Sequence, residues 1–334
     1  MISSTGLWVS ERWRGLLAAV TIGAASLFVA EHYGGPSVLY ALLLGMAFNF
    51  LSEDPKVVPG MTFASTTLLR IGVGLLGARI AAEQLALLTP GLLVLIVGAT
   101  FATVAVSLFL NRWVKWPRAE AALVGGAVAI CGASASIALA TVIPKKDLRE
   151  QSLLAVVVAV TAMSTLAMII YPFIASALGL PKAEAGIFLG ATIHDVAQVV
   201  GAGAMIGGDA TETATMAKML RVAMLVPMLI LFGMMFRDRS PSAGQSVHWT
   251  KNIPLFLIGF IVLAVVNVAG WIPKNISTLL GETSRLLILI AIAGLGIKTS
   301  LGKLREVGWA PLILMAADSV FLVVVVLTGL VFLR

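Results

Sequence analysis

The stretch GGAVAICGASASIALATVIPKK, from Gly125 to Lys146, interrupts an apolar run with glycines, serines and the single cysteine of the chain. If the helix breaks within CGASAS (Cys131 to Ser136), the backbone N–H groups of the restarting half lose their partners at the positive end of a helix dipole. Such an end binds anions without any basic side chain, and serine hydroxyls add further donors. The alternative is that the small residues only let neighbouring helices pack closely.

The composition of the whole chain is that of a membrane protein. Of its 334 residues, 59% are hydrophobic and 12% are charged, whereas a soluble domain carries about a quarter charged residues. We therefore expect an all-α polytopic membrane protein, with segments long enough to cross about 30 Å of hydrocarbon. Eleven apolar segments lie near 15–31, 36–52, 61–80, 88–110, 119–143, 152–177, 183–206, 212–236, 253–271, 279–302 and 310–333.

Several kinds of partner and site are excluded by the same composition. The net charge of +7 is spread over short connections, as the positive-inside bias explains, so no nucleic-acid partner is expected. One cysteine rules out an intramolecular disulfide, and three histidines without clustered carboxylates predict neither a metal site nor a cofactor. Because His194 and Asp195 are adjacent, the acid cannot readily brace the imidazole as in a Ser-His-Asp hydrolase, and we expect no enzyme.

A single transmembrane transporter domain is expected over 1–334, with one long polar loop at 237–252. We interpret the basic and apolar N-terminus as an uncleaved first helix that starts in the cytoplasm. The basic loop PKKDLREQ, from Pro144 to Gln151, lies on the wrong side of the membrane unless segments 119–143 and 183–206 are re-entrant. Irregular backbone at membrane depth is allowed where protein or a cavity surrounds it, so both arrangements remain open.

Two internal sequence similarities indicate a duplicated core. The segment from Ala121 to Ile143 aligns with that from Ala185 to Gly207, and LLGARIAAEQL (Leu75 to Leu85) aligns with GLGIKTSLGKL (Gly294 to Leu304). The second pair lies an odd number of segments apart, so its helices are expected to run antiparallel. Inverted repeats with interrupted helices are typical of secondary transporters.

The segment GATIHDVAQVVGAG, which aligns with CGASAS, places three polar side chains in an apolar run. On a regular helix His194 and Gln198 share one face with Gly201, and Asp195 points about 100° away. Such groups are costly inside a membrane unless they face a cavity or one another. We expect His194 to donate to an oxyanion or exchange protons, and Asp195 to orient it or carry a coupled proton.

Other charges within apolar segments need partners. Arg70 lies deep in the third segment, Lys218 and Arg221 share a face of the eighth, and Asp318 lies in the last. Neutralising pairs such as Arg70 with Asp318 or Arg221 with Asp195 compete with direct substrate contact as explanations. Arg79 and Lys298 are expected to snorkel to the interface, and Asp209 or Thr211 with Glu212 to cap a helix without further function.

Five motifs carry a resemblance to a known family. LLRIGVGLLGARI, AICGASASIA, ATIHDVAQVVGAG, KMLRVAMLVPM and AIAGLGIKTSL occur in this order within residues 36–330. They resemble the bacterial inner-membrane proteins designated candidate sulfate exporters, which are grouped with transporters similar to sodium/proton antiporters and bile-acid symporters. The resemblance implies a panel and a core bundle, with discontinuous helices that cross near mid-membrane.

The resemblance also implies which residues bind the ligand. It points to the Cys-Gly-Ala-Ser-Ala motif at 131–135, the His-Asp-x-x-Gln motif at 194–198 and Arg221. The fifth segment would cross either the seventh or the tenth. Residues 297–301 read IKTSL where the family often has LKTDL, so no role for an acid is carried over there.

We therefore predict a secondary transporter that moves a small anion, sulfate, sulfite or a sulfonate-like species, across the inner membrane by alternating access. Expected partners are that anion, membrane lipid, a coupling proton or sodium ion, and a second copy in a homodimer. The expected coupling residues are His194, Asp195 and Asp318. The expected substrate-binding residues are Cys131, Gly132, Ala133, Ser134, Ser136, His194, Gln198, Gly201, Arg70 and Arg221.

Two other functions stay open at this point. A cation/proton antiporter needs two adjacent buried carboxylates, for which only Asp195 and Asp318 are candidates. A non-transporting membrane enzyme or partner subunit would need a spaced nucleophile and base, which the sequence does not show.

Overall fold

The structure is a computed structural model that describes residues 4–236, 254–300, 302 and 307–333, and its regular elements there are all helical. Seven helical runs are long and apolar enough to cross a membrane, which confirms an all-α polytopic membrane protein. They are α1 (Ser4–Tyr33), the run from α3 to η3 (Val58–Arg79), α6 (Pro90–Val114), α9 (Glu150–Ala177), α12 with α13 (Ala210–Met235), α15 (Lys274–Lys298) and α17 (Trp309–Phe332).

Shorter helices complete the fold. The helix α2 (Ser37–Ala47) continues into η1 (Asn49–Glu53), and α14 (Leu255–Val268) precedes α15. The run Val58–Arg79 consists of α3 (Val58–Thr62), a π-helical turn η2 (Phe63–Leu68), α4 (Leu69–Leu76) and η3 (Gly77–Arg79), and α5 (Ala82–Ala86) follows it. The polar loop expected at 237–252 lies outside the described residues.

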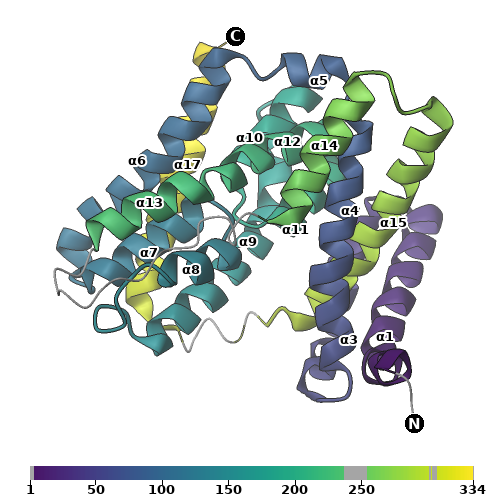
Figure 1. Cartoon of the computed structure of the whole chain (residues 1–334), viewed down its shortest axis with the longest axis horizontal. Helices are drawn as coiled ribbons and strands as arrows, with labels where there is room; N and C mark the ends of the chain where they lie inside the picture. Colours follow the sequence, from purple (N-terminus) through teal and green to yellow (C-terminus); the bar gives the residue numbers. More distant parts are fainter. Residues whose placement is uncertain (1–3, 237–253, 301, 303–306, 334) are drawn as a thin grey trace.

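The helices form two bundles, which Figure 1 shows on opposite sides of the molecule. The panel bundle contains α1, α2, the run α3–η3, α14 and α15, and the core bundle contains α6 to α13 and α17. Close backbone contacts hold the panel together. A Cβ added to Gly45 of α2 would stand 2.5 Å from the carbonyl oxygen of Ala293 in α15, so only glycine allows this approach.

Segment 119–143 does not cross the membrane but forms a re-entrant hairpin. Its two arms are α7 (Arg118–Ala129) and α8 (Ala133–Ala140). A Cβ on Gly126 would collide with Leu139, although thirteen residues of continuous helix would hold these positions about 20 Å apart. The chain therefore turns back at residues 130–132. Both ends of the hairpin lie on one side, where Arg149 bonds Glu120.

Segment 183–206 forms a second hairpin, which enters from the opposite side. Its arms are α10 (Lys182–Thr192) and α11 (Val196–Ile206). Gly186 lies against Ala210, and Gly190 lies against Ala214, so α10 runs parallel to α12 (Ala210–Ala223). The helix α11 returns in the opposite direction and packs on the start of α12, because Gly203 contacts Thr211 just after the turn. The open alternative is thus settled in favour of two re-entrant segments.

The two hairpins meet at their tips. A Cβ on Gly132 in the first tip would lie 3.8 Å from the backbone carbonyl carbon of His194 in the second. The fifth segment therefore meets the seventh. The tenth segment, α15, continues without a break from Lys274 to Lys298.

Helix boundaries repeat at the same sequence offsets, 64 and 219 residues, as the two internal similarities found in the sequence. The helices α7 and α10 begin at residues 118 and 182, and α6 and α17 begin at residues 90 and 309. The start of α6 packs against the end of α17, because a Cβ on Gly91 would collide with Leu333. These two helices are therefore antiparallel, as expected for an inverted repeat.

Candidate functional site

Two buried cations of α12 lie where the hairpin tips meet. The ammonium group of Lys218 donates to the carbonyl oxygens of Ile130 at 2.6 Å, of Ile193 at 2.8 Å and of His194. These carbonyls follow the last turns of α7 and α10, where a helix has no partners of its own for them. A positive charge is also favoured at this negative end of a helix dipole. Lys218 therefore ties both hairpins to α12.

Arg221, one turn further along α12, has the same role. Its Nε donates to Ala129 at 2.8 Å, its Nη1 donates to Ala191 at 2.8 Å and to Ile193 at 2.9 Å, and its Nη2 donates to Val128. Arg221 is 1% exposed, and the proposed pairing with Asp195 is wrong because these guanidinium donors are directed to carbonyl oxygens. Direct substrate contact by Arg221, implied by the resemblance, would require some of these bonds to break.

The tip of the second hairpin differs from the regular helix that its sequence suggested. His194 lies in the break, and Asp195 is the N-cap of α11, with its carboxylate accepting from the Ala197 N–H at 3.3 Å. His194 and Gln198 thus do not share one face of a helix. Because the Asp195 carboxylate already occupies the positive end of α11, a second anion is disfavoured there.

Polar groups of α9 and α17 hold this tip. The Ser164 hydroxyl accepts from the Asp195 N–H at 3.0 Å, and Gln198 Nε2 donates to Thr165 Oγ1 at 3.4 Å. His194 Nε2 lies 3.0 Å from the Ser319 hydroxyl. His194 Nδ1 and Gln198 Oε1 are buried and have no hydrogen-bond partner within the described ranges.

The tip of the first hairpin has no acidic cap. Gly132 is the N-cap of α8 with φ +64°, and as a glycine it has no side chain to cap this end of the helix. The Ser136 hydroxyl is committed to the Gly132 carbonyl oxygen at 3.0 Å. Ser134, in the first turn, is exposed and lines a cavity of about 670 Å³. This end of α8 therefore remains the better candidate for an anion.

Arg70 lies on the panel wall of that same cavity. It is exposed, whereas Asp318 is fully buried in the core bundle, so the proposed pair between Arg70 and Asp318 is wrong. Among the described residues no hydrogen bond or ion pair engages the Arg70 guanidinium. Ser134 and Arg70 are thus the two candidate substrate residues that the structure places around one cavity.

The other candidates at the tips and in α11 are packed into the core. Cys131 is buried, and Gly132 lies against Val160 and the backbone of His194. A Cβ on Gly201 would collide with Met168, so this glycine serves the contact between α11 and α9. Ala133 is partly buried beside Ser134.

Asp318, in the middle of α17, is the carboxylate with the fewest partners in this region. It is 0% exposed, and neither of its oxygens has a hydrogen-bond partner in the part of the chain that the structure describes. The facing hydroxyl of Ser107 donates to the Ala121 carbonyl oxygen at 2.9 Å. A buried carboxylate without a partner carries a large desolvation cost unless it binds a proton or a cation.

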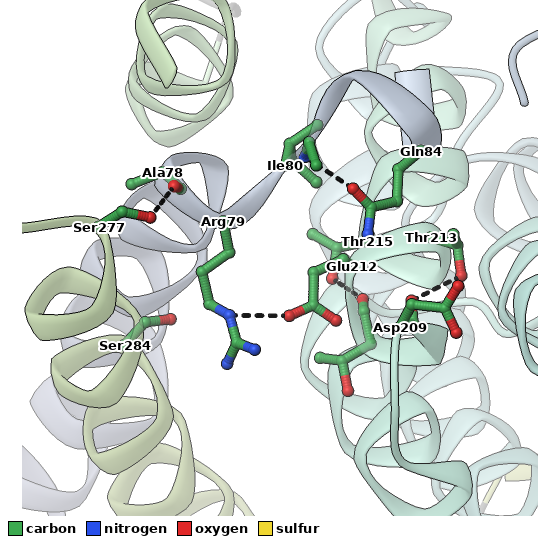
Figure 2. Close-up of polar contacts among 12 residues, drawn as sticks. Ala78, Arg79, Ile80, Gln84, Asp209, Glu212, Thr213, Thr215, Ser277 and Ser284 are labelled. Carbon is green, nitrogen blue, oxygen red and sulfur yellow. Dashed lines mark hydrogen bonds and ion pairs between the residues drawn. The ribbon is translucent and has the colours of Figure 1, made fainter. Parts of the chain in front are cut away.

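Arg79 and Glu212 form an ion pair that the sequence did not suggest. Arg79 Nε lies 3.0 Å from Glu212 Oε1, and Figure 2 shows Arg79 reaching from the end of the panel run to α12 of the core bundle. The expectation that Arg79 snorkels to the interface is wrong, because its side chain turns to a carboxylate that is 4% exposed.

The comparisons with known proteins identify the family. The family model described as Conserved hypothetical protein 698 matches residues 14–315. The chain is 46% identical to the UPF0324 membrane protein TauZ of Paracoccus pantotrophus, over 99% of this chain and 98% of that one. It is 44% identical to the UPF0324 membrane protein CT0845 of Chlorobaculum tepidum, over 96% and 89% of the two chains.

The chain belongs to the UPF0324 membrane protein family. A third relative, the UPF0324 membrane protein RB0971 of Rhizobium meliloti, is 44% identical over 96% of this chain and 92% of its own length. The family membership expected from the five motifs is confirmed, and these names describe membrane proteins without stating a substrate. No solved structure matches the chain.

Sequence reasoning missed the partners of several UPF0324 site residues. The spacing of Lys218 and Arg221 predicts that they share one face of a helix. It does not predict the carbonyl groups that they bind, which belong to residues 24 to 93 positions away in the sequence. Ser164, Thr165 and Ser319 gave no signal, because isolated hydroxyls in membrane helices usually bond the preceding turn of their own helix.

Proposed function

We propose that this UPF0324 protein is a secondary transporter that moves a small anion, sulfate, sulfite or a sulfonate, across the bacterial inner membrane by alternating access. The N-terminus and the open end of the first hairpin then face the cytoplasm, in keeping with the basic residues Lys145, Lys146 and Arg149 at that end.

The observation that carries the proposal is the uncapped N-terminal end of α8, which opens onto the cavity shared by Ser134 and Arg70. Backbone N–H groups of the first turn, a serine hydroxyl and a guanidinium provide the donors that a tetrahedral oxyanion accepts from. Lys218 and Arg221 are occupied by carbonyl oxygens, so the charge available to the anion comes from Arg70 and the helix end.

Alternating access is supported by the position of the cavities. The cavity of about 670 Å³ lies between α8 and the panel bundle, and another of about 520 Å³ lies between α11 and the panel bundle. The first is lined by Ser134 and Ala138 of α8, and the second by Glu31 at the end of α1 and by Gly207 at the open end of the second hairpin. Movement of the core bundle against the panel would open one and close the other.

Asp318 is the best candidate for coupling. Its carboxylate is enclosed in the core bundle and has no partner among the residues that the structure describes, so a proton or a sodium ion bound there would be exchanged during the transport cycle. His194 and Asp195 are held by Ser319, Ser164 and the end of α11, and they serve to position the second tip.

Uptake of radiolabelled sulfate into proteoliposomes tests the proposal, with sulfite and ethanesulfonate as unlabelled competitors. We expect Ser134→Ala and Arg70→Gln each to lower uptake about tenfold, the effect of losing about 1.4 kcal/mol of binding. Arg112→Gln, which removes an exposed charge at the end of α6, is the matched control and should transport normally. Absence of flux for all three anions under any ion gradient contradicts the proposal.

A cation/proton antiporter is the second candidate, favoured by the enclosed Asp318 alone. The two carboxylates it needs are in different settings, since Asp195 caps α11 and Asp318 faces Ser107. A sodium-dependent proton flux that is lost in Asp318→Asn and unchanged in Ser134→Ala would select this function over anion transport.

A further inference from the structure

The cavity of about 520 Å³ between α11, α12 and the panel bundle contains an unusual set of charges. Two arginines and two glutamates line it: Arg79 and Arg285 from the panel, Glu31 from the end of α1, and Glu212 from α12. The set has no net charge. A cavity built for a simple anion would not be expected to hold as many carboxylates as guanidinium groups.

Glu212 leaves one buried acceptor without a donor. Its Oε1 takes the bond from Arg79 Nε at 3.0 Å, whereas Oε2 is buried and has no partner among the described residues. The residue is 4% exposed. A buried carboxylate oxygen is normally satisfied, and leaving one unpaired is costly. A ligand in this cavity would therefore be expected to bring an N–H or O–H donor to Glu212.

Arg79 leaves donors of the complementary kind. Only its Nε bonds Glu212, and Figure 2 shows the two terminal guanidinium nitrogens on the side of the ion pair away from Ile80 and Gln84. The Arg79 side chain passes over Gly281 of α15. Arg285 is one helical turn further along the same face and is exposed without a bond to any described residue.

We propose that this cavity binds a small zwitterion, which carries an oxyanion group and an ammonium group a few bonds apart. The oxyanion would accept from Arg79 and Arg285, and the ammonium would donate to Glu212 Oε2. An anion alone would leave Glu212 Oε2 unpaired, and a cation alone would leave the terminal donors of Arg79 and Arg285 unused. The site lies on the other side of the hairpin tips from Ser134, and it does not depend on the proposed anion transport.

Isothermal titration calorimetry on the full chain in detergent micelles tests this site with matched probes. β-Alanine is compared with propionate and ethylammonium, and 2-aminoethanesulfonate with ethanesulfonate, so that the oxyanion and the ammonium are removed in turn. We expect a zwitterion to bind at least about tenfold more tightly than either of its halves. Equal affinity for propionate and β-alanine overturns the proposal, and so does the absence of any binding heat for β-alanine and for 2-aminoethanesulfonate.

Two variants locate the binding. Glu212→Gln should weaken the zwitterion about tenfold and leave propionate unchanged, whereas Arg285→Gln should weaken both. Because Arg285 is exposed, we expect Arg285→Gln to fold normally, so binding to the site can still be tested if Glu212→Gln folds poorly. Glu282→Gln removes an exposed charge from the same helix outside the cavity lining and should bind as the unchanged chain does. Binding that is unaltered by both Glu212→Gln and Arg285→Gln also overturns the proposal, whatever the sulfate flux.

Discussion

The ammonium nitrogen of Lys218 lies 2.6 Å from the carbonyl oxygen of Ile130, at the point where the first hairpin turns back. The same nitrogen also bonds Ile193 and His194 in the second hairpin. One side chain therefore joins two hairpins that enter from opposite sides. With Arg221, it replaces the hydrogen bonds that two interrupted helices lose.

Replacement of Lys218 by methionine should destabilise the protein strongly. Three buried carbonyl oxygens would lose a donor. That of Ile193 keeps its bond from Arg221, but the other two would be left unsatisfied, at a cost of about 1–3 kcal/mol each. We expect a large fall in the melting temperature measured in detergent. Lys298→Met is the control, because this exposed lysine makes one weak bond to Thr62 at 3.4 Å. Equal melting temperatures for the two variants would mean that the carbonyls find other donors.

Gly132→Ala should also destabilise the protein, through the backbone. Gly132 has φ +64° and ψ −126°, a conformation that L-residues adopt only at a cost of about 1–3 kcal/mol. Gly98→Ala is the matched control in the regular helix α6, where an added Cβ meets no atom within 4 Å, and it should be neutral or stabilising. A Gly132→Ala protein with the same melting temperature as the unchanged chain would contradict a sharp turn at this residue.

The base of the first hairpin should loosen when its ion pair is removed. Glu120 is buried and accepts two bonds from the Arg149 side chain, at 2.8 Å and 2.7 Å. The Glu120 carboxylate raises the pKa of the Arg149 guanidinium. In Arg149→Gln we expect faster hydrogen exchange over residues 118–149, measured by mass spectrometry, because a buried charge is left unpaired. Exchange as slow as in Arg118→Gln would count against this role.

Much of this architecture follows from the sequence, and the reasons for the failures are physical. The break at residues 130–132 was predictable because Gly132 weakens a helix and the serines that follow are poorer helix formers than alanine or leucine. The break at Ile193 to Asp195 was not predictable, because the sequence HDVAQ is equally compatible with an uninterrupted helix that has its polar residues on one face. Its carboxylate signals an N-cap only once the chain is known to turn.

The ion-pair partner of Arg79 could not be predicted from the sequence for a related reason. Its position after a glycine-rich helix end is equally consistent with snorkelling to the interface. Glu212 is more than a hundred residues away, at the start of a helix in the other bundle. Only the packing of panel against core brings the two together.

Asp318→Asn should separate transport from its driving ion. An unpaired buried carboxylate costs free energy, so the amide should leave the melting temperature unchanged or raise it. We expect sulfate exchange at equal concentrations to persist and its acceleration by an ion gradient to disappear, as measured in proteoliposomes. Glu282→Gln is the exposed control. An Asp318→Asn protein that still responds fully to the gradient would place coupling elsewhere.

Protection of one thiol tests most directly whether an anion sits at the N-terminal end of α8. With Cys131 replaced by serine, Ser134→Cys provides a single reactive thiol in the cavity, and Ile137→Cys provides another on the same helix outside the cavity lining. In detergent, we predict that sulfate slows methanethiosulfonate labelling severalfold at Ser134→Cys and has no effect at Ile137→Cys. Labelling rates at Ser134→Cys that are the same with and without sulfate, sulfite and ethanesulfonate would contradict the account.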